Sequence, residues 1–293
     1  MPIDSFRLAP ADIRFVGENL SRPECVLCEA DGSVWVSDDR AALTRIDPNG
    51  RQTLVGAMKA LPNGIALAKD GSFYIANIGD AKVYAMTREG TERVICASLD
   101  GCGLGSCNFT YLDPAGRLWV TISTYHEPRA EAARNPRPDG VLFRIDLKTG
   151  RATKVLDGLH FTNEVRVRDG YMYIVETSVG RIVRAPLRAD GRLGELELYG
   201  PSPVFHGALL DGIAFDADGN LWATEVGKNS IVVITPERRA HVVFQDPEAK
   251  VLNRPASIAF GGPGRRTAYI GSLAMTRLAV FDAPAAGASM AHW

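Results

Sequence analysis

Short hydrophobic runs with an aromatic residue at their centre recur along the whole chain. Each run follows a turn with Asp-Gly or a variant of it, and a further short strand pattern follows each run. The six copies are DGSVWVSD (31–38), DGSFYIAN (70–77), AGRLWVTI (115–122), DGYMYIVE (169–176), DGNLWATE (218–225) and RRTAYIGS (265–272). Their central aromatic residues are 39 to 54 residues apart, which is the size of a four-stranded propeller blade. The pattern therefore predicts an all-β fold, a six-bladed β-propeller.

The strands within one repeat are short and are separated by Gly and Asp turns. The second repeat reads NGIALAKDG, SFYIANIGD, KVYAMTREG and TERVICA, and no segment of the chain has sustained helical periodicity. The sixth repeat lacks a fourth strand, because the chain becomes rich in Ala, Gly and Pro after LAVFD (278–282). We expect DIRFVGENL (12–20) to supply that strand, so that residues 1–293 form one domain without an exposed sheet edge.

Composition and charge exclude several classes of function. The formal net charge is −1 and no basic stripe is present, so we expect no nucleic-acid partner. No apolar run is long enough to cross a bilayer, and residues 1–16 lack the apolar stretch of a signal peptide, so we expect no membrane partner. The five cysteines are odd in number and form no disulfide framework, which favours a cytoplasmic location.

Polar residues recur at one offset before the central aromatic residue. They lie 10 or 11 residues before it in five repeats, and Ser257 lies 12 before it in the sixth. The first strand of a propeller blade is the innermost, so these side chains are predicted to ring the axis at one face. The five residues are Glu24, Asn63, Asn108, Asn163 and Asp211.

Two interpretations of this ring are open for the individual residues. Asn63-Gly64 and Asp211-Gly212 are common turn dipeptides, so these side chains could bond only to their own backbone. Glu24 and Asn108 are followed by strand residues, which turns do not explain. Converging carboxylates would repel one another without a cation, and carboxylate and amide oxygens suit Ca²⁺, Mg²⁺ or Mn²⁺. The ring therefore favours a divalent-metal site with open positions for water and substrate.

At these residues the chain resembles the family of senescence marker protein, gluconolactonase and luciferin-regenerating enzyme. The resemblance covers nearly the whole chain and is most specific in 107–124, 161–184, 209–226 and 258–273. It implies a propeller lactonase with one axial metal, Ca²⁺ as the first expectation and Zn²⁺, Mn²⁺, Mg²⁺ or Fe²⁺ as alternatives. The implied metal ligands are Glu24, Asn108, Asn163 and Asp211, and Asp211 is the implied general base or nucleophile. Asn63 is left as a pocket residue.

Some positions depart from the family pattern. Cys25 and Val26 stand where sugar lactonases commonly have Gly-Pro, Ser106 where they often have a sugar-binding Arg, and Phe109 where Asp is common. These residues make the predicted pocket wall less polar. They favour a hydrophobic lactone or ester over a sugar-acid lactone as the small-molecule substrate.

Further substrate-binding residues are predicted near the same face. The loop 125–139 is the longest on that face, and it is either a solvated insertion or a lid. As a lid, it would let His126, Arg129 or Arg134 meet a substrate carboxylate or oxyanion. His160 and His206 precede the strands that carry Asn163 and Asp211, so they too are predicted near the mouth.

Two other functions remain open on the sequence. A propeller that only binds a ligand or a protein would not need the Glu, Asn, Asn, Asp set, and it would hold no stoichiometric metal. An enzyme similar to strictosidine synthase, suggested by NEVRVRDGYMYIVET (163–177), would act by acid–base catalysis and keep its activity in a chelator.

Overall fold

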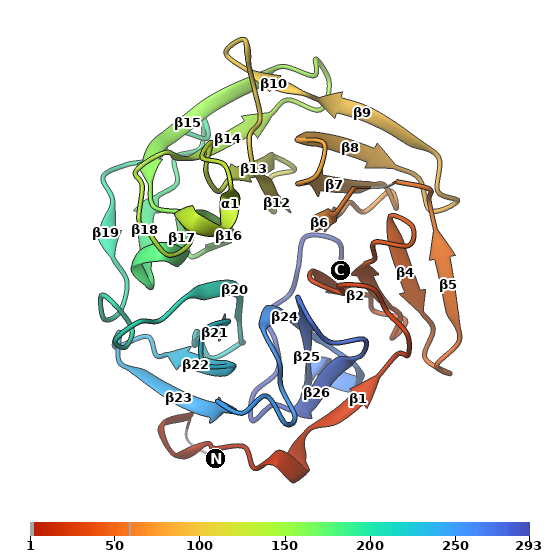
Figure 1. Cartoon of the computed structure of the whole chain (residues 1–293), viewed down its shortest axis with the longest axis vertical. Coiled ribbons are helices and arrows are strands. Elements are labelled where there is room, and N and C mark those ends of the chain that lie inside the picture. The colour runs from red at the N-terminus through yellow and green to blue at the C-terminus, as the bar shows by residue number, and fades with distance from the viewer. Residues whose placement is uncertain (1–2, 59) are drawn as a thin grey trace.

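Six four-stranded antiparallel sheets surround a central axis (Figure 1). This architecture is seen in a computed structural model that describes residues 3–58 and 60–293. Blade 1 consists of β2 (Val26–Cys28), β3 (Val34–Ser37), β4 (Leu43–Ile46) and β5 (Gln52–Val55). Blade 2 consists of β6 (Pro62–Leu67), β7 (Phe73–Asn77), β8 (Lys82–Met86) and β9 (Glu92–Cys96). Blade 3 consists of β12 (Cys107–Leu112), β13 (Leu118–Ile122), β14 (Gly140–Ile145) and β15 (Ala152–Leu159). The predicted all-β, six-bladed propeller is confirmed.

Blades 4 to 6 repeat the same plan. Blade 4 consists of β16 (Thr162–Arg168), β17 (Tyr171–Glu176), β18 (Arg181–Pro186) and β19 (Glu197–Leu198). Blade 5 consists of β20 (Leu210–Phe215), β21 (Leu221–Glu225), β22 (Ser230–Ile234) and β23 (Ala240–Gln245). Blade 6 consists of β24 (Pro255–Gly261), β25 (Thr267–Ser272), β26 (Leu278–Asp282) and β1 (Arg14–Val16). A two-stranded hairpin, β10 (Ser98–Leu99) and β11 (Cys102–Gly103), lies outside the blades. The helical elements are one turn of α-helix, α1 (Arg129–Ala132), and the 3₁₀ turns Ile3–Ser5, Pro10–Asp12, Thr177–Val179 and Pro263–Arg265.

The N-terminal strand closes the ring as predicted. β1 pairs antiparallel with β26, with Phe15 opposite Ala279. The Arg14 guanidinium also donates two hydrogen bonds, of 3.0 and 2.7 Å, to the carboxylate of Asp282. Blade 6 therefore combines the two ends of the chain, and its outer edge is covered by a strand that comes from the opposite end of the sequence.

The recurring aromatic residue has the same place in the repeats that carry tryptophan. The three indole rings are almost completely buried, and each indole N–H donates to a carboxylate six residues earlier in the chain. The pairs are Trp35 with Glu29 at 2.5 Å, Trp119 with Asp113 at 2.9 Å and Trp222 with Asp216 at 2.9 Å. A buried indole needs such a hydrogen-bond partner. In these three blades the tryptophan ring thus packs in the core, and its N–H group also binds a carboxylate six residues earlier in the chain.

The C-terminal tail crosses the axis at one end of the channel. The amide of Ala288 donates to the carbonyl of Phe215, and the His292 ring nitrogen Nε2 lies 2.8 Å from the carbonyl oxygen of Cys28. Figure 1 shows the C-terminus at the centre of the ring. The tail therefore covers the inner strands at one end of the channel.

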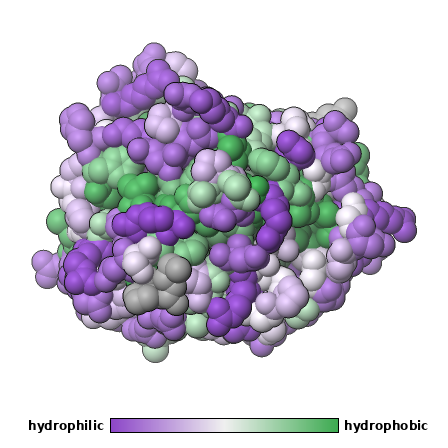
Figure 2. Space-filling view, turned by 90° about the horizontal axis from the view of Figure 1, so that it is seen from below, coloured by the Kyte–Doolittle hydropathy of each residue, from purple (hydrophilic) through white to green (hydrophobic). Residues whose placement is uncertain are grey.

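The outer side of the propeller, seen edge-on, shows hydrophobic residues between hydrophilic margins (Figure 2).

Candidate active site

The six innermost strands contact one another all the way round the axis. The contacting pairs are β2 with β6, β6 with β12, β12 with β16, β16 with β20, β20 with β24, and β24 with β2. Figure 1 shows these strands closest to the centre. The starts of the strands therefore form one ring, which is where the sequence placed its recurrent polar residues.

A β-bulge marks the polar position in five of the six inner strands. The pairing register shifts between Pro62 and Ile65, Cys107 and Phe109, Thr162 and Val165, Leu210 and Ile213, and Pro255 and Ile258. A bulge interrupts the ladder and re-aims a side chain. Asn63, Asn108, Asn163 and Asp211 each lie within these shifts. The bulges explain how strand residues turn their polar groups toward the axis.

The Asn-Gly and Asp-Gly dipeptides are strand residues and not turns. Gly64 lies inside β6 and Gly212 inside β20. A Cβ at Gly212 would lie 2.4 Å from the carbonyl oxygen of Ala256, and one at Gly64 would lie 2.5 Å from the Cα of Phe109. The turn interpretation of these two dipeptides is therefore wrong. Glycine is required here because adjacent inner strands approach each other closely.

The side chains of the ring are buried and linked by hydrogen bonds. Asn63 Nδ2 donates to Glu24 Oε1 at 3.0 Å and to Asn108 Oδ1 at 2.5 Å. Asn108 Nδ2 donates to Asn163 Oδ1 at 2.9 Å and to Ser123 Oγ at 2.8 Å, and Asn163 Nδ2 donates to a threonine hydroxyl. Hydrogen bonds thus link Glu24, Asn63, Asn108 and Asn163 in a continuous row around the ring.

The two carboxylates of the ring have incomplete hydrogen bonding. Glu24 is 5% exposed and Asp211 is 6% exposed, and neither Glu24 Oε2 nor Asp211 Oδ1 has a hydrogen-bond partner. Burial raises the pKa of Glu24, with partial relief from Arg22, Arg129 and the Asn63 amide. Burial and the negative charges of Glu24 and Glu164 raise the pKa of Asp211 well above its ordinary value. Two buried carboxylates with unpaired oxygens are suited to hold a cation.

The donor set fits a divalent metal ion held by oxygen atoms. Within the described residues, no group of three or more His, Cys, Asp or Glu side chains is arranged to hold a metal. The oxygens of the ring are two carboxylates, the amide oxygens of Asn108 and Asn163, which also accept one hydrogen bond each, and Asn63 Oδ1, which is buried without a partner. Their two negative charges balance a dication, and hard oxygen donors are the ligands that Ca²⁺ and Mg²⁺ prefer.

A cavity of about 650 Å³ opens above Glu24, Asn163 and Asp211. Its wall combines apolar side chains, among them Phe161, Leu209 and Leu273, with polar and cationic ones. Loop 125–139 covers part of it through Arg129, Ala130, Ala133 and Arg134. This loop is therefore neither fully solvated nor remote: its α-helical turn forms part of the cavity wall.

Of the predicted substrate residues, Arg129 and Arg134 line the cavity. Burial and the nearby Arg22 cation lower the pKa of Arg129, while Asp211 and Glu24 oppose this change. Its guanidinium lies 5.1 Å from the ring centroid of Phe161, and its Nε atom is buried without a partner. The position of Arg129 above two carboxylates agrees with a role in holding a substrate group.

The other predicted substrate residues lie outside the cavity wall. Asn63 is fully buried in the ring, and the Ser106 hydroxyl is buried without a hydrogen-bond partner. The His126 ring lies 3.1 Å from Glu131, the His160 ring lies 2.9 Å from Glu176, and His206 is exposed. None of the five is among the residues that line the cavity, so their roles as substrate contacts stay predictions.

Sequence reasoning missed several residues at this face. Arg22, Phe161 and Arg254 have left-handed backbone angles, with φ of 51°, 55° and 49°. Each lies two or three residues before the polar position of its repeat. A bulky residue in this conformation is strained, and such strain concentrates at functional sites. Comparison of the repeats at the positions two or three residues before the recurrent polar residue would have found these residues.

An ion pair lies on the axis beneath the ring. Arg166 Nη2 is 2.7 Å from Glu164 Oε2, and the guanidinium is 5.0 Å from the ring centroid of Phe109. Burial raises the pKa of Glu164 to about 7, against the opposing effect of Arg166. This pair separates the ring from the other end of the channel.

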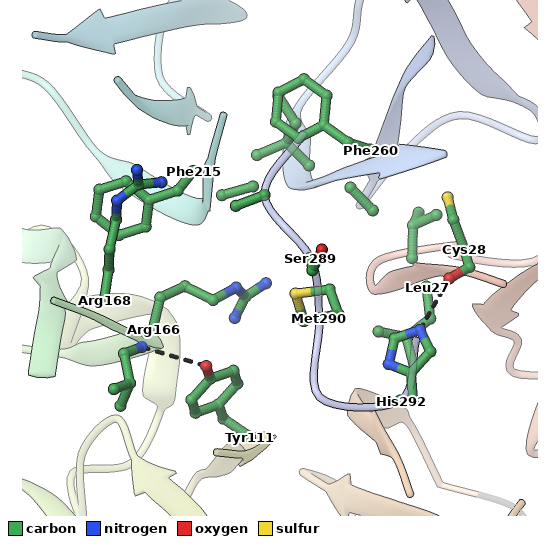
Figure 3. A pocket seen from close by; sticks show the side chains of 16 residues that line it. Leu27, Cys28, Tyr111, Arg166, Arg168, Phe215, Phe260, Ser289, Met290 and His292 are labelled. Atoms are coloured by element: carbon green, nitrogen blue, oxygen red, sulfur yellow. Dashed lines mark hydrogen bonds between the residues drawn. The ribbon is translucent and has the colours of Figure 1, made fainter. Parts of the chain in front are cut away.

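A second, smaller cavity lies at that other end. It has a volume of about 150 Å³ and is enclosed by the lower inner strands and by Ala288, Ser289, Met290 and His292 of the tail. Figure 3 shows the Arg166 guanidinium pointing toward Met290. The lining of this smaller cavity contains arginines but no carboxylate. The larger cavity, which contains both ring carboxylates, is therefore the candidate active site.

Comparisons with known proteins agree with this architecture. A model of the SMP-30/Gluconolactonase/LRE-like region matches residues 22–274. A 6-deoxy-6-sulfogluconolactonase of Pseudomonas putida is 26% identical over 245 residues, which cover 81% of this chain and 78% of that protein. A gluconolactonase structure from Xanthomonas campestris has a TM-score of 0.77 at 16% identity and covers 97% of this chain and 93% of that chain. A calcium-binding regucalcin from Agrobacterium tumefaciens has a TM-score of 0.72 at 19% identity and covers 94% and 96%.

Proposed function

Because this chain belongs to the SMP-30/Gluconolactonase/LRE-like family, we propose that it is a divalent-metal-dependent hydrolase of a lactone or a related ester. The family membership and the lactonase type of enzyme that the sequence predicted are confirmed at this level. The observation that carries the finer proposal is the pair of unpaired buried oxygens, Glu24 Oε2 and Asp211 Oδ1, at the floor of the larger cavity.

The metal ligands in this proposal are Glu24, Asn108, Asn163 and Asp211. Ca²⁺ is the first expectation, which is supported by the all-oxygen donor set and by the calcium-binding regucalcin of the same fold. When bound, a divalent cation supplies Lewis-acid polarisation of the substrate carbonyl. Asn63 fixes the carboxylate of Glu24 and the amide of Asn108 through its hydrogen bonds.

Asp211 is the proposed catalytic residue. It either accepts a proton from the attacking water or attacks the carbonyl carbon itself. In the first route the water oxygen bonds to the carbonyl carbon, Asp211 takes the proton, and the ring C–O bond breaks. The leaving oxygen then receives the proton from Asp211. Arg129 lines the same cavity, within electrostatic range of Asp211, and is the proposed substrate-binding arginine.

The location of the protein is part of the proposal. Among residues 3–58 and 60–293 there is no helix with the length and apolar character that crossing a membrane requires. The five cysteines are all free, and four of them are buried. Unpaired cysteines in a lactonase of this kind support the expected cytoplasmic location.

The proposal is tested by hydrolysis of lactones and esters before and after the metal is removed. The protein is stripped with a chelator, dialysed, and assayed with Ca²⁺, Mg²⁺, Mn²⁺, Zn²⁺ and Fe²⁺ added back singly. We expect turnover to be lost on stripping and regained with one of these ions, at one metal per chain. Turnover that survives stripping would favour a metal-independent enzyme similar to strictosidine synthase. Absence of both metal and turnover would favour a binding propeller.

A further inference from the structure

Four arginine side chains gather around the candidate active site without a carboxylate partner. Arg129, Arg134 and Arg254 line the larger cavity, and Arg22 lies two residues before Glu24. In the described part of the chain, no ion pair includes any of the four.

The two inner arginines also have unsatisfied hydrogen-bonding groups. Arg129 Nε and Arg22 Nη1 are buried and have no hydrogen-bond partner. Glu24 and Asp39 are within electrostatic range of Arg22, yet neither forms an ion pair with it. A buried donor without an acceptor destabilises the folded protein, and it is retained where a ligand supplies the acceptor. The acceptor that matches a guanidinium best is an anion with two or three oxygens.

The charge balance of the cavity also favours an anionic ligand. Glu24 and Asp211 are the carboxylates among the residues that line it, and in the proposed function their two charges balance one dication. The three guanidinium groups of the wall are then uncompensated. The rest of the wall is uncharged and combines apolar side chains with amide and hydroxyl groups, so it suits the uncharged body of a ligand; the apolar side chains include Phe161 and Leu209, and the polar ones are Asn163, Thr177, Asn229 and Asn253. The cavity therefore combines a cationic mouth with an uncharged wall.

We propose that the substrate of this enzyme is an anionic lactone or ester, whose carboxylate or sulfonate substituent is bound by Arg129, Arg134 and Arg254. This inference rests on the proposed function. The carbonyl group of the substrate lies over Glu24 and Asp211, and the anionic substituent points toward the mouth. Arg134 and Arg254 are exposed and come from opposite sides of the cavity, one from loop 125–139 and one from the residue before β24. They act as specificity residues and do not take part in bond breaking.

The experiment compares matched substrates that differ in one charge. D-glucaro-1,4-lactone and D-glucono-1,4-lactone share the same ring and differ at C6, which is a carboxylate in the first and a hydroxymethyl group in the second. We expect kcat/KM to be about tenfold or more higher for the charged lactone, the size of one charge-assisted contact. NaCl should raise KM for the charged lactone and leave KM for the neutral one unchanged, because salt screens exposed charges. A second pair, 6-deoxy-6-sulfo-D-glucono-1,5-lactone and D-glucono-1,5-lactone, distinguishes a sulfonate from a carboxylate.

Variants assign the preference to the proposed residues. Arg254→Met and Arg134→Met should each lower the ratio of charged to neutral kcat/KM by about three- to tenfold, and Arg129→Met should lower it further. Arg137→Met is the matched control, because Arg137 is exposed on the same loop and does not line the cavity. It should leave both substrates unchanged. Thermal unfolding of each variant verifies that it is folded.

The outcomes separate this inference from the proposed function. If both neutral lactones are hydrolysed at least as well as their charged partners, the inference is overturned and the proposed function stands. If the charged lactones are preferred but the ratio is the same in all four variants, the arginines do not provide the preference and the inference is also overturned. If no lactone of either pair is hydrolysed but the wider lactone and ester panel shows metal-dependent turnover, the inference is overturned and the proposed function stands. If the wider panel also shows no turnover with any added metal, the proposed function fails and the inference fails with it.

Discussion

Asn63 Nδ2 donates a hydrogen bond of 3.0 Å to Glu24 Oε1, and both side chains are buried in the ring of inner strands. The two residues come from neighbouring blades, so this bond connects β6 with the segment that precedes β2. The same amide nitrogen donates to Asn108 Oδ1 on the other side. One side chain thus orients two of the four proposed metal ligands without itself being one of them.

The Asn63→Leu variant removes these hydrogen bonds while it keeps a similar volume. We expect its affinity for the added metal to fall by about 10- to 100-fold, the usual effect of losing a group that orients a metal ligand. The measurement is a calorimetric titration of the stripped protein. Asn49→Leu, at an exposed turn of blade 1, is the control and should keep wild-type affinity. An unchanged dissociation constant in Asn63→Leu would show that Asn63 does not orient the ligands.

Replacement of Asp211 by Asn separates catalysis from folding. This change keeps the shape of the side chain but removes its charge and its ability to accept a proton. Turnover of the best lactone should fall by about 10²- to 10⁴-fold, the contribution of a general base. Metal content, measured by mass spectrometry, should be reduced but detectable, because three ligands remain. Asp218→Asn, at an exposed turn of the same blade, is the control. Turnover near the wild-type rate with metal present would contradict the role of Asp211.

Glu24→Gln should have opposite effects on stability with and without metal. Burial raises the pKa of Glu24, so the contribution of this group to stability is fully present below its unfolded pKa and is lost as pH rises through the folded pKa. In the metal-free protein above that pKa, Glu24→Gln should therefore raise the melting temperature, by roughly 2–4 °C. With saturating metal the same variant should melt below wild type, because a ligand is missing.

The comparison of melting curves at several pH values tests this directly. In the chelator, the advantage of Glu24→Gln should grow from pH 5 to pH 8. If Glu24→Gln melts below wild type both without metal and with saturating metal, the Glu24 carboxylate is stabilised by its neighbours and does not need a bound cation.

Glu176 provides the opposite pH dependence. Burial alone would raise its pKa, but hydrogen bonds from Arg181 and His160 lower the pKa below the ordinary value. Its stabilising contribution is therefore present above the unfolded pKa of about 4.5 and is lost as pH falls through the folded pKa. Glu176→Gln should be less stable than wild type at pH 7 by about 1.5–3 kcal/mol, the range for hydrogen bonds to a charged group.

Urea unfolding at pH 7 and at pH 3 measures this difference. The gap between Glu176→Gln and wild type should shrink at the lower pH. Glu195→Gln, within the same blade, is the control. A constant gap across the pH range would show that the charge of Glu176 does not stabilise the fold.

The sequence predicted the polar ring because the inner strands repeat. Glu24, Asn108, Asn163 and Asp211 occupy equivalent positions, and each repeat faces the axis in the same way, so an offset of 10 or 11 residues places them all. The bulges that re-aim them were not predicted. A bulge depends on how closely the next inner strand approaches, as the contact between Gly212 and Ala256 shows, and this distance is a property of the closed ring.

The amino-acid sequence by itself determined the number of blades, the closure by residues 12–20 and the residues of the ring. These features follow from local strand patterns that recur at regular intervals. Only the tertiary structure decided that Arg129, Arg134 and Arg254 line one cavity, that His160 pairs with Glu176, and that the C-terminal tail covers the far end of the channel. Loops and tails do not follow the repeat: their conformation depends on contacts between distant blades, which form once the ring has closed.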